Sequence, residues 1–452
     1  MPVLLEMYAP AAGASSYIDW TVSVVDSGIT SGYARNTLAV DANGAAHIAY
    51  LDFAAKDIKY ATRDGVGWLV EVVEDSTALD SPMITAMPSL ALDSQGRPHV
   101  VYAAARDGAN VLVHASRNSM VWNYETIVST NGWPCDYRLS LDENDQPHVT
   151  YSIWSGVSMD LHYRTRDVDV WSDSIIGEGD QSALVLDDAG CPVVVFRGLS
   201  GESVTHLQHA ALVDGVWSVE ELAYQGNWPT LALDGVGLVH LTTKMGSWVY
   251  YATNVTGTWV FTPICQSITD ARNAPIEIDG FGDPVIAFTD SGHNLCWAFR
   301  YGDTWSIDFI DPEGGPTWGN TPGMAIDALG YPRVAFRGGG GLELTTGYDQ
   351  MLTAVDNQPP ESARALWAVP NPFNPMTRIK YDVPVDGRVT LRVYDIRGAL
   401  IRTLVDADLP RGSHQATWDG RDASGRGMAS GSYFARLEAG GRVETVRMSL
   451  VR

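Results

Sequence analysis

The stretch LALDSQGRPHVVY (residues 90–102) contains the pattern on which most of this 452-residue sequence is built. A short apolar run ends in Asp93, a turn containing Gly96 follows, and a second apolar run starts at Pro98. Two such runs joined by a short glycine-containing turn are typical of a β-hairpin. The stretch therefore predicts two antiparallel strands.

The hairpin pattern recurs at nearly constant spacing along the chain. The Asp that ends the first run is found seven times, as Asp41, Asp93, Asp142, Asp187, Asp234, Asp279 and Asp327. A third apolar stretch follows each hairpin, and in six units a tryptophan then opens a fourth: Trp68, Trp122, Trp171, Trp217, Trp259 and Trp305. A repeat of roughly 45 to 50 residues with four strands is typical of a propeller blade. We therefore expect an all-β fold with a seven-bladed β-propeller at residues 1–355.

The seventh unit lacks this tryptophan, and a matching segment lies near the N-terminus. The segment DWTVSVVD (residues 19–26) has the pattern of a fourth strand and carries Trp20 in the equivalent place. An unpaired strand edge promotes aggregation, so a closed ring is favoured. We predict that residues 19–26 complete the last blade.

The recurrent polar residues have a structural interpretation and a metal-binding alternative. Each repeat Asp can accept backbone N–H groups in its turn, and the Gly can supply a positive φ, whereas calcium binding is the alternative. Histidines follow the turn in four units, as His47, His99, His148 and His240. Equivalent positions on different blades lie far apart, so these histidines are interpreted as hydrogen-bonded packing residues. We predict no metal and no cofactor, and we expect the tryptophans to fill the space between blades.

Composition excludes several classes of protein. The chain has 30 Lys and Arg against 54 Asp and Glu, a formal charge of -24, and only four of the basic residues are lysine. A surface that binds nucleic acid needs the opposite balance. No apolar run approaches the roughly 18 residues of a membrane span, and the N-terminus has no basic segment typical of a signal peptide. The four cysteines have no C-x-x-C spacing for zinc or redox chemistry. Separately, we expect the protein to be a monomer.

Differences between blades are more informative about function than the shared scaffold. The loops entering each first strand and those joining the second and third strands should share one face of the propeller. The candidate ligand-binding residues on this funnel are Trp133, Trp154, Trp228, Trp318, Arg106, Arg197, Arg272 and Arg337. Aromatic rings beside arginines suit a glycan, because rings stack on sugars and guanidinium groups bind hydroxyls or carboxylates. The alternative is that the tryptophans only cap the blades.

Evidence for an enzyme is weaker. No G-x-S-x-G elbow, H-E-x-x-H helix or phosphate loop is present. The turns TRDGVGW (residues 62–68) and VDGVW (residues 213–217) resemble degenerate Asp-box turns of sialidase-like propellers, without their regular spacing. That resemblance implies an arginine clamp, for which Arg106, Arg197 and Arg337 are the candidates, but no tyrosine nucleophile is indicated. A polysaccharide-active hydrolase or lyase therefore remains an alternative, as does a structural adhesion module.

The C-terminal region has a different character. Residues 361–452 carry 14 Arg and Lys against 10 Asp and Glu, whereas the remainder has a net charge of -28. The segment DNQPPESARALWA (residues 356–368) is polar and proline-containing, which is typical of a linker. Short alternating runs separated by glycine turns then predict a small Ig-like β-sandwich at residues 369–452.

Several motifs in this region together carry a family resemblance. They are PNPFNP (370–375), VYDIRG (393–398), HQATWDGRDASGR (414–426), SGSYFARL (430–437) and VRMSLVR (446–452). The region resembles the C-terminal sorting domain of type IX secretion cargo and is similar to the Ig-like domain of flagellar hook-capping proteins. The positions that match are Pro370, Asn371, Pro372, Tyr394, Asp395, Gly398, Trp418, Asp419, Gly431 and Tyr433.

The resemblance implies export across an outer membrane, with the type IX secretion machinery as partner. Family cargo also carries an N-terminal signal, which this sequence does not show, and the alternative is a terminal Ig-like accessory module. We therefore expect a secreted or surface-exposed propeller whose funnel binds a glycan or a protein.

Overall fold

The computed structural model consists of β-strands joined by turns. It describes the following residues: 18–29, 36–63, 67–75, 88–119, 121–156, 158–167, 170–200, 204–223, 225–254, 258–267, 273–279, 282–301, 304–311, 322–327, 330–349, 366–369, 376–395, 398–429 and 431–450. Within these residues every regular element is a strand, and no helix is present that could cross a membrane. The chain divides into two compact units, Met1–Thr353 and Ala354–Arg452.

The first unit contains seven four-stranded blades, numbered here in chain order. Blade 1 is β2 (Asn36–Val40), β3 (Ala46–Asp52), β4 (Asp57–Arg63) and β5 (Trp68–Glu74), and blade 2 is β6 (Ser89–Leu92), β7 (Pro98–Arg106), β8 (Ala109–Asn118) and β9 (Val121–Thr130). Blade 5 is β18 (Asn227–Leu233), β19 (Val239–Met245), β20 (Trp248–Thr253) and β21 (Val260–Gln266), and blade 6 is β22 (Ile276–Ile278), β23 (Pro284–Thr289), β24 (Leu295–Tyr301) and β25 (Thr304–Asp311).

Blades 3 and 4 share one long strand, β14 (Ser174–Leu186). Blade 3 contains β10 (Pro134–Leu141), β11 (Pro147–Trp154) and β12 (Met159–Asp167), with the short β13 (Val170–Trp171) also paired to β12. Blade 4 contains β15 (Pro192–Ser200), β16 (Val204–Val213) and β17 (Val216–Ala223). The start of β14 pairs with β12 and its end pairs with β15, so the outer strand of blade 3 becomes the inner strand of blade 4 without a loop.

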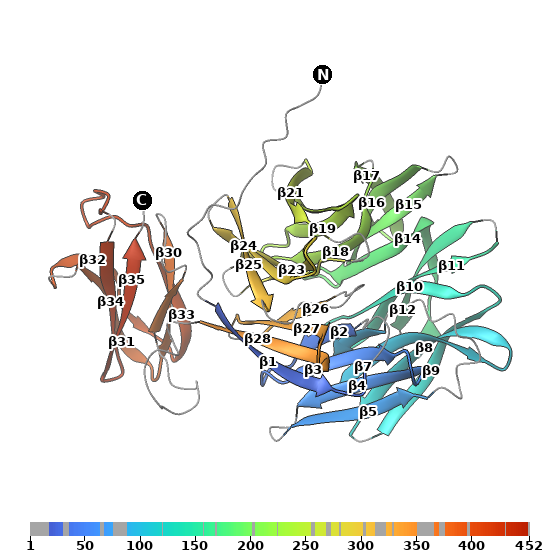
Figure 1. Cartoon of the computed structure of the whole chain (residues 1–452). Helices are drawn as coiled ribbons and strands as arrows, with labels where there is room; N and C mark the ends of the chain where they lie inside the picture. The colour runs from blue at the N-terminus through green and yellow to red at the C-terminus, as the bar shows by residue number, and fades with distance from the viewer. Residues whose placement is uncertain are drawn as a thin grey trace. The chain divides into compact units, whose positions relative to one another are not determined.

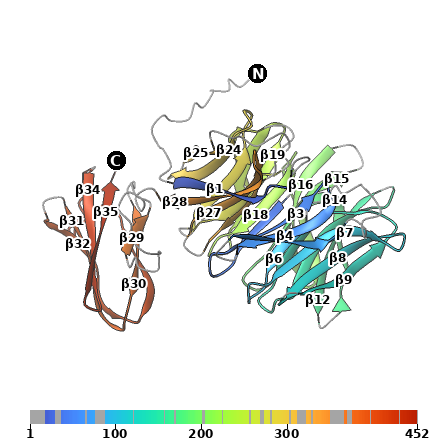
Figure 2. The same ribbon diagram turned by 60° about the horizontal axis from the view of Figure 1, so that its bottom comes forward.

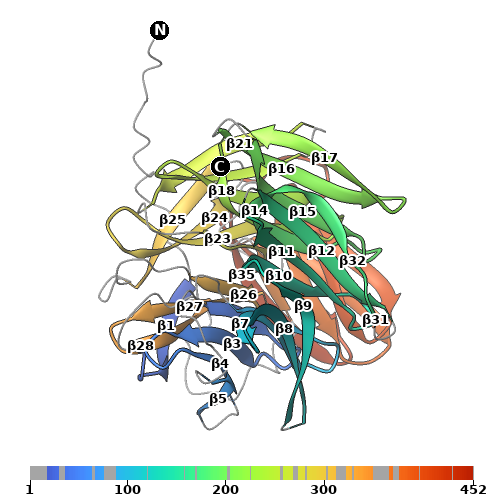
Figure 3. The same cartoon turned by 90° about the vertical axis from the view of Figure 1, so that its right-hand side faces the viewer.

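Blade 7 combines the two ends of the first unit. Its strands are β26 (Gly323–Ile326), β27 (Pro332–Gly338), β28 (Gly341–Asp349) and β1 (Ile18–Asp26), in that order. The N-terminal strand runs antiparallel to β28, with Thr21 opposite Thr346, and Figures 2 and 3 both show the two strands side by side. The predicted segment thus forms the outer strand of the last blade.

The inner strands of the blades contact one another in sequence around a ring (Figure 1). The series begins with β2 and β6, continues through β10, β14, β18 and β22, and reaches β26, which contacts β2 again. Every blade is therefore flanked by two others, and the seven-bladed propeller expected from the sequence is observed.

Tryptophans of the outer strands pack on the preceding blade. Trp122 meets Tyr60 edge to face at a ring separation of 5.5 Å, and Trp305 meets Tyr251 at 5.0 Å. Trp20 of β1 occupies the same role, with its ring 5.7 Å from that of Trp297. These contacts agree with the predicted wedges, because edge-to-face rings fill the space between adjacent sheets.

The repeat Asp residues hold their own turns. Asp41 Oδ1, for example, accepts backbone N–H groups from Asn43 and Ala45 at 2.9 and 2.8 Å. The third residue after the repeat Asp has a positive φ in all seven blades; it is glycine in six and Asp145 in blade 3. The structural interpretation of these aspartates is therefore correct.

The repeat histidines are also bonded within the blades. Nδ1 of His47 lies 2.5 Å from the hydroxyl of Tyr60, and its Nε2 lies 3.6 Å from Asp41 Oδ2. His148 and His240 make the equivalent contacts, whereas His99 contacts His114 instead. Burial lowers the pKa of all four imidazoles, that of His99 to about 4. They are packing residues, as expected.

The second unit is the predicted Ig-like sandwich. One sheet has the order β29 (Leu366–Val369), β30 (Thr377–Val383) and β33 (Gly412–Trp418), and the other has the order β32 (Leu400–Leu409), β31 (Gly387–Asp395), β34 (Gly431–Ala439) and β35 (Arg442–Leu450). Side chains of both sheets, including Ile379 and Leu391, share one core. Residues 366–368 lie in β29, so the segment predicted as linker is too long at its C-terminal end, because Leu366 and Ala368 are buried in this core.

Candidate functional site

Three neighbouring blades carry the same irregularity near the start of their inner strands. Asp136, Gln181 and Trp228 all have a positive φ, of 50°, 53° and 54°, and each lies six residues before its repeat Asp. The strand register shifts at each of these positions. A left-handed conformation costs a non-glycine residue about 1 kcal/mol or more, and bulges redirect side chains beside functional sites. The bulges mark the place where blades 3 to 5 depart from a regular sheet.

A glycine in a closely packed position accompanies two of the bulges. Gly179 and Gly226 each lie two residues before the left-handed residue. A Cβ atom at Gly179 would lie 2.6 Å from the carbonyl oxygen of Arg197, and one at Gly226 would lie 2.9 Å from Thr243 Oγ1. The contact at Gly179 is with the backbone and is too short for any side chain, so glycine is required there, whereas at Gly226 the side chain of Thr243 would have to shift.

A polar network joins the three bulges. Arg197 donates from Nε and Nη2 to the two carboxylate oxygens of Asp180, at 2.7 and 2.5 Å, and from Nη1 to Asn227 Oδ1 at 3.2 Å. Burial alone would lower the pKa of Arg197, but the hydrogen bond and charge of Asp180 outweigh it and raise the pKa. The backbone N–H of Trp228 donates to Gln181 Oε1 at 2.9 Å, which links blade 5 to blade 4.

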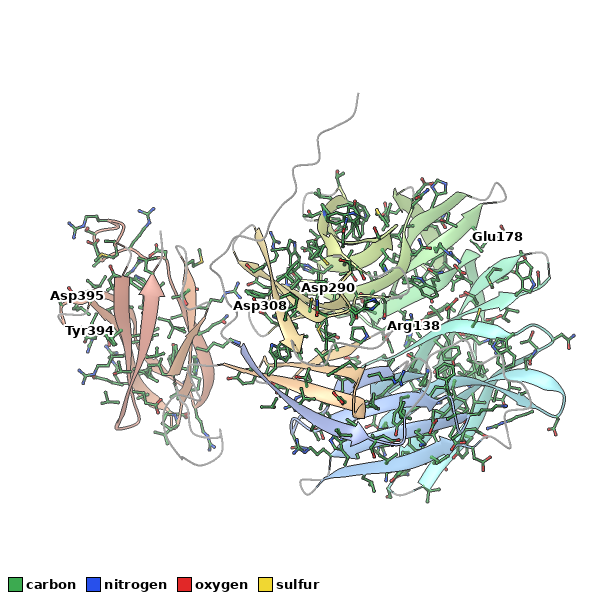
Figure 4. All side chains as sticks on the ribbon, in the orientation of Figure 1. Arg138, Glu178, Asp290, Asp308, Tyr394 and Asp395 are labelled. Atoms are coloured by element: carbon green, nitrogen blue, oxygen red, sulfur yellow. The ribbon has the colours of Figure 1, made fainter. Side chains whose placement is uncertain are left out.

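We call this group of residues the bulge site. It consists of Asp136, Arg138, Asp180, Gln181, Arg197, Asn227 and Trp228. Ser182 extends it by donating to the carbonyl oxygen of Asp136 at 3.2 Å. In Figure 4, Arg138 lies near the centre of the ring. Across the described ranges, no group of three His, Cys, Asp or Glu side chains could hold a metal ion.

Aromatic residues lie at the same end of the inner strands. Trp154 ends β11 and is 50% exposed, which is unusual for a large ring. Pro134 lies opposite Ile153 in the ladder, so Trp133 is next to Trp154 across the two strands, and it packs against the core of blades 2 and 3. Trp228 is half-buried. A sugar ring could therefore reach Trp154 most readily.

The remaining predicted funnel residues are not part of this network. Arg106 lies on blade 2, where its guanidinium pairs with Glu74 at 2.5 Å, and Arg337 lies on β27 of blade 7. Arg272 and Trp318 fall outside the described residues. The three arginines considered as a clamp are thus on blades 2, 4 and 7, and two of them already bind carboxylates of the protein.

Sequence reasoning missed five members of the bulge site: Asp136, Arg138, Asp180, Gln181 and Asn227. One signal was available, because the four residues before each repeat Asp can be compared across all seven units. Among these positions only Arg138 and Glu277 are charged. The left-handed conformations had no such signal, since none of the three residues is a glycine.

The motif residues of the C-terminal unit build its framework. Trp418 is fully buried, donates to the carbonyl oxygen of Arg421 at 2.9 Å, and meets Tyr433 edge to face at 4.9 Å. The hydroxyl of Tyr433 donates to the carbonyl oxygen of Ala429 at 2.7 Å. These two aromatic motif residues therefore fix the strands around a common core.

Polar motif residues hold turns and an ion pair. Asp395 Oδ1 accepts the backbone N–H of Ala399 at 2.8 Å, and Gly398 has a φ of 80° in that turn. Asp419 pairs with Arg402 at 2.8 Å. Tyr394 ends β31 with Asp395, and Gly431 begins β34. Pro370, Asn371 and Pro372 fall outside the described residues.

Comparison with known proteins finds a family match for part of the C-terminal unit. Residues 379–442 match the FlgD Ig-like domain family, and no curated protein matches the sequence. A fungal alcohol oxidase of the AA5 family in complex with copper is similar in structure, with a TM-score of 0.50 and 12% identity over 92% of this chain and 97% of the oxidase. At this identity the likeness concerns the fold alone.

Two further solved structures are less similar. PorZ, a surface component of the type IX secretion system of Porphyromonas gingivalis, has a TM-score of 0.45 and 14% identity over 91% of this chain and 59% of PorZ. The Aleuria aurantia lectin in complex with alpha-methyl-L-fucoside has a TM-score of 0.44 and 14% identity over 63% of this chain and 96% of the lectin. Neither likeness is strong enough to assign a function.

Proposed function

We propose that the bulge site binds a glycan. The observation that carries this proposal is the left-handed bulge repeated on blades 3, 4 and 5, which gathers a network of guanidinium, amide and carboxylate groups at the end of the strands where Trp154 is exposed. Sugars present an apolar ring face and several hydroxyls, so an aromatic surface next to directional polar groups suits them.

The contacts of Asp180 favour binding over hydrolysis. A glycosidase uses two carboxyl groups about 5 to 9.5 Å apart, one of which delivers a proton. Both oxygens of Asp180 accept hydrogen bonds from Arg197, so this carboxylate is committed to holding the site together. Asp180 therefore acts as a positioning group, and the glycan contacts come from its neighbours.

Substitution of Trp154 tests the proposal. We expect Trp154→Ala to weaken glycan binding at least about fivefold, because a lost aromatic stack is worth roughly 1 kcal/mol or more. The full chain is applied to a glycan array, and the affinity for the best ligand is measured by calorimetry. Phe309→Ala is the matched control, since Phe309 is 55% exposed on the outer strand β25 of blade 6.

Two results would contradict glycan binding at this site. One is a wild-type protein that binds no glycan on the array. The other is equal affinity of the Trp154 variant, the Phe309 variant and the wild type, with unchanged melting temperatures in all three. Capture of a purified surface protein in place of a glycan would point to the protein-ligand alternative.

We further propose that the C-terminal unit is an export address for the type IX secretion machinery. The support is the match of residues 379–442 to the FlgD Ig-like domain family together with the motifs that flank this range. Function as an address requires a folded sandwich, which the buried Trp418 and Tyr433 provide.

Deletion of residues 369–452 tests the export proposal. The full reading frame is expressed in a bacterium that has the type IX machinery and in a matched strain that lacks it. We expect the intact frame to reach the surface or medium only in the first strain, and the deletion to remain inside both. A full-length protein that stays in the cytoplasm of the first strain with its C-terminal unit intact would rule out an address.

A further inference from the structure

Arg138 is the only cationic residue among the inner-strand positions that precede the repeat Asp residues. In the other blades its position is occupied by Thr37, Ser89, Ala183, Thr230, Pro275 and Gly323. Small or uncharged residues suffice for the scaffold at this place, because these strands lie closest to one another around the ring. The guanidinium group of Arg138 thus needs an explanation beyond packing.

The neighbours of Arg138 show which way its side chain faces. Side chains two residues apart share one face of a strand, and residues directly opposite each other in a ladder share a face as well. Ser140, two residues on, donates to the carbonyl oxygen of Leu184 in β14 at 3.3 Å. Thr150, opposite Arg138, contacts Ser182 Oγ in β14 at 2.9 Å. Arg138 therefore faces blade 4, beside the bulge at Gln181.

Hydrogen bonding leaves most of this guanidinium group available. A guanidinium has five N–H donors, and that of Arg138 makes a single hydrogen bond among the described residues, from Nη1 to the carbonyl oxygen of Tyr137 at 2.9 Å. Arg197, in contrast, is held by Asp180 and Asn227 through three hydrogen bonds. Arg138 is thus the cation of the bulge site that remains free to bind a ligand.

The energetics of Arg138 favour an anionic ligand. The side chain is half-buried, and burial lowers its pKa, which the nearby charge of Asp136 offsets only in part. A cation removed from water without full compensation gains from a bound anion. The planar carboxylate of a sugar acid matches the fork of a guanidinium better than a neutral hydroxyl does.

We propose that the bulge site selects glycans bearing a carboxylate and that Arg138 binds this carboxylate. The inference rests on the proposed glycan binding and names the class of sugar. The net charge of -28 over residues 1–360 repels polyanions in general. A short acidic oligosaccharide, held at one built cation, is therefore the expected ligand.

The test compares matched ligands with and without the carboxylate. Oligogalacturonate, its methyl ester and a sulfated oligosaccharide of similar length are titrated into the full chain and into Arg138→Gln and Arg138→Lys. We expect the wild type to bind oligogalacturonate at least about tenfold more tightly than the methyl ester. Arg138→Gln should bind the two equally, whereas Arg138→Lys should keep part of the preference.

The outcomes separate this inference from the proposed function. If the wild type binds neutral sugars at Trp154 and has no preference for the acid, glycan binding stands and the role of Arg138 falls. The same conclusion follows if Arg138→Gln, with an unchanged melting temperature, keeps the full preference, or if the sulfated ligand binds most tightly. Absence of binding to every glycan would overturn the proposed function and this inference together.

Discussion

Removal of residues 1–28 should abolish the cooperative unfolding of the propeller. This segment supplies β1, which forms the full antiparallel ladder with β28 from Ile18 to Asp26. Without it, β28 would present an unpaired edge, and the ring of Trp297 would lose its contact with Trp20. The seventh blade would then have three strands, and its contact with blade 1 would weaken.

Polar contacts make β1 a link between the first and last blades as well. Asp26 accepts a hydrogen bond from the hydroxyl of Tyr50 at 2.7 Å and lies 3.4 Å from Lys59 Nζ, and both partners belong to blade 1. Val25 is buried in a cluster that includes Ala335 of blade 7 and Ile48 of blade 1. Deletion therefore removes a closure between two sheets in addition to one strand.

Thermal melting of the truncated chain measures this effect. We expect either insoluble protein or a melting temperature lower by more than about 10 °C. Deletion of residues 1–17, which leaves β1 intact, is the control and should leave the melting curve of the propeller unchanged. Identical melting of the full chain and the shorter protein lacking residues 1–28 would show that β1 does not close the ring.

The propeller could be predicted because its signals are local and repeated. Asp93 and Gly96 form a turn from groups only a few residues apart, and the same turn is encoded seven times. The missing seventh tryptophan even indicated the place of Trp20. The continuous β14 was not predictable in the same way, because its passage from blade 3 to blade 4 depends on the pairing of two different neighbours.

The candidate site was predictable only in part, since its partners are set by register. Arg197 was identified from its loop position as a residue that binds ligand, but it lies opposite Asp180 in the ladder of β14 and β15 and is paired there. That register includes the bulge at Gln181, which no glycine marks. The sequence named Arg197 and Trp228 as candidates but could not show that Arg197 is already paired with Asp180.

Glu277 is the second charged residue among the four positions that precede each repeat Asp, and its chemistry differs from that of Arg138. Four of the other blades have alanine at this place: Ala39, Ala91, Ala232 and Ala325. Burial raises the pKa of Glu277 to about 7, and among the described residues no opposing charge or hydrogen bond contributes to that shift. The carboxyl group is thus held where its charged form is poorly solvated.

Replacing Glu277 with alanine should stabilise the protein at pH 8. A carboxyl whose pKa rises from 4.5 to about 7 on folding destabilises the folded state by about 3 kcal/mol once it is ionised in both states. This cost is small below pH 4.5, grows between pH 4.5 and about 7, and stays constant above that, because the folded state binds the proton more tightly than the unfolded state only within this window. The buried histidines give stability the opposite dependence on pH. They are present in the wild type and in the alanine variant, so their contribution cancels when the two free energies of unfolding are subtracted.

Denaturant unfolding of the wild type and Glu277→Ala at pH 8 and pH 4.5 tests this expectation. The variant should be more stable by about 3 kcal/mol at the higher pH and by much less at the lower one. Glu277→Gln keeps the shape of the side chain, and its stability difference from the wild type should depend on pH in the same way as that of Glu277→Ala. Glu178→Ala, at an exposed position on β14, should change the free energy of unfolding little at either pH. Two results would contradict this expectation: a variant that is less stable than the wild type at pH 8, or a stability difference that does not depend on pH. Either would mean that the charge of Glu277 is balanced by a partner in the folded propeller, as the charge of Asp180 is by Arg197.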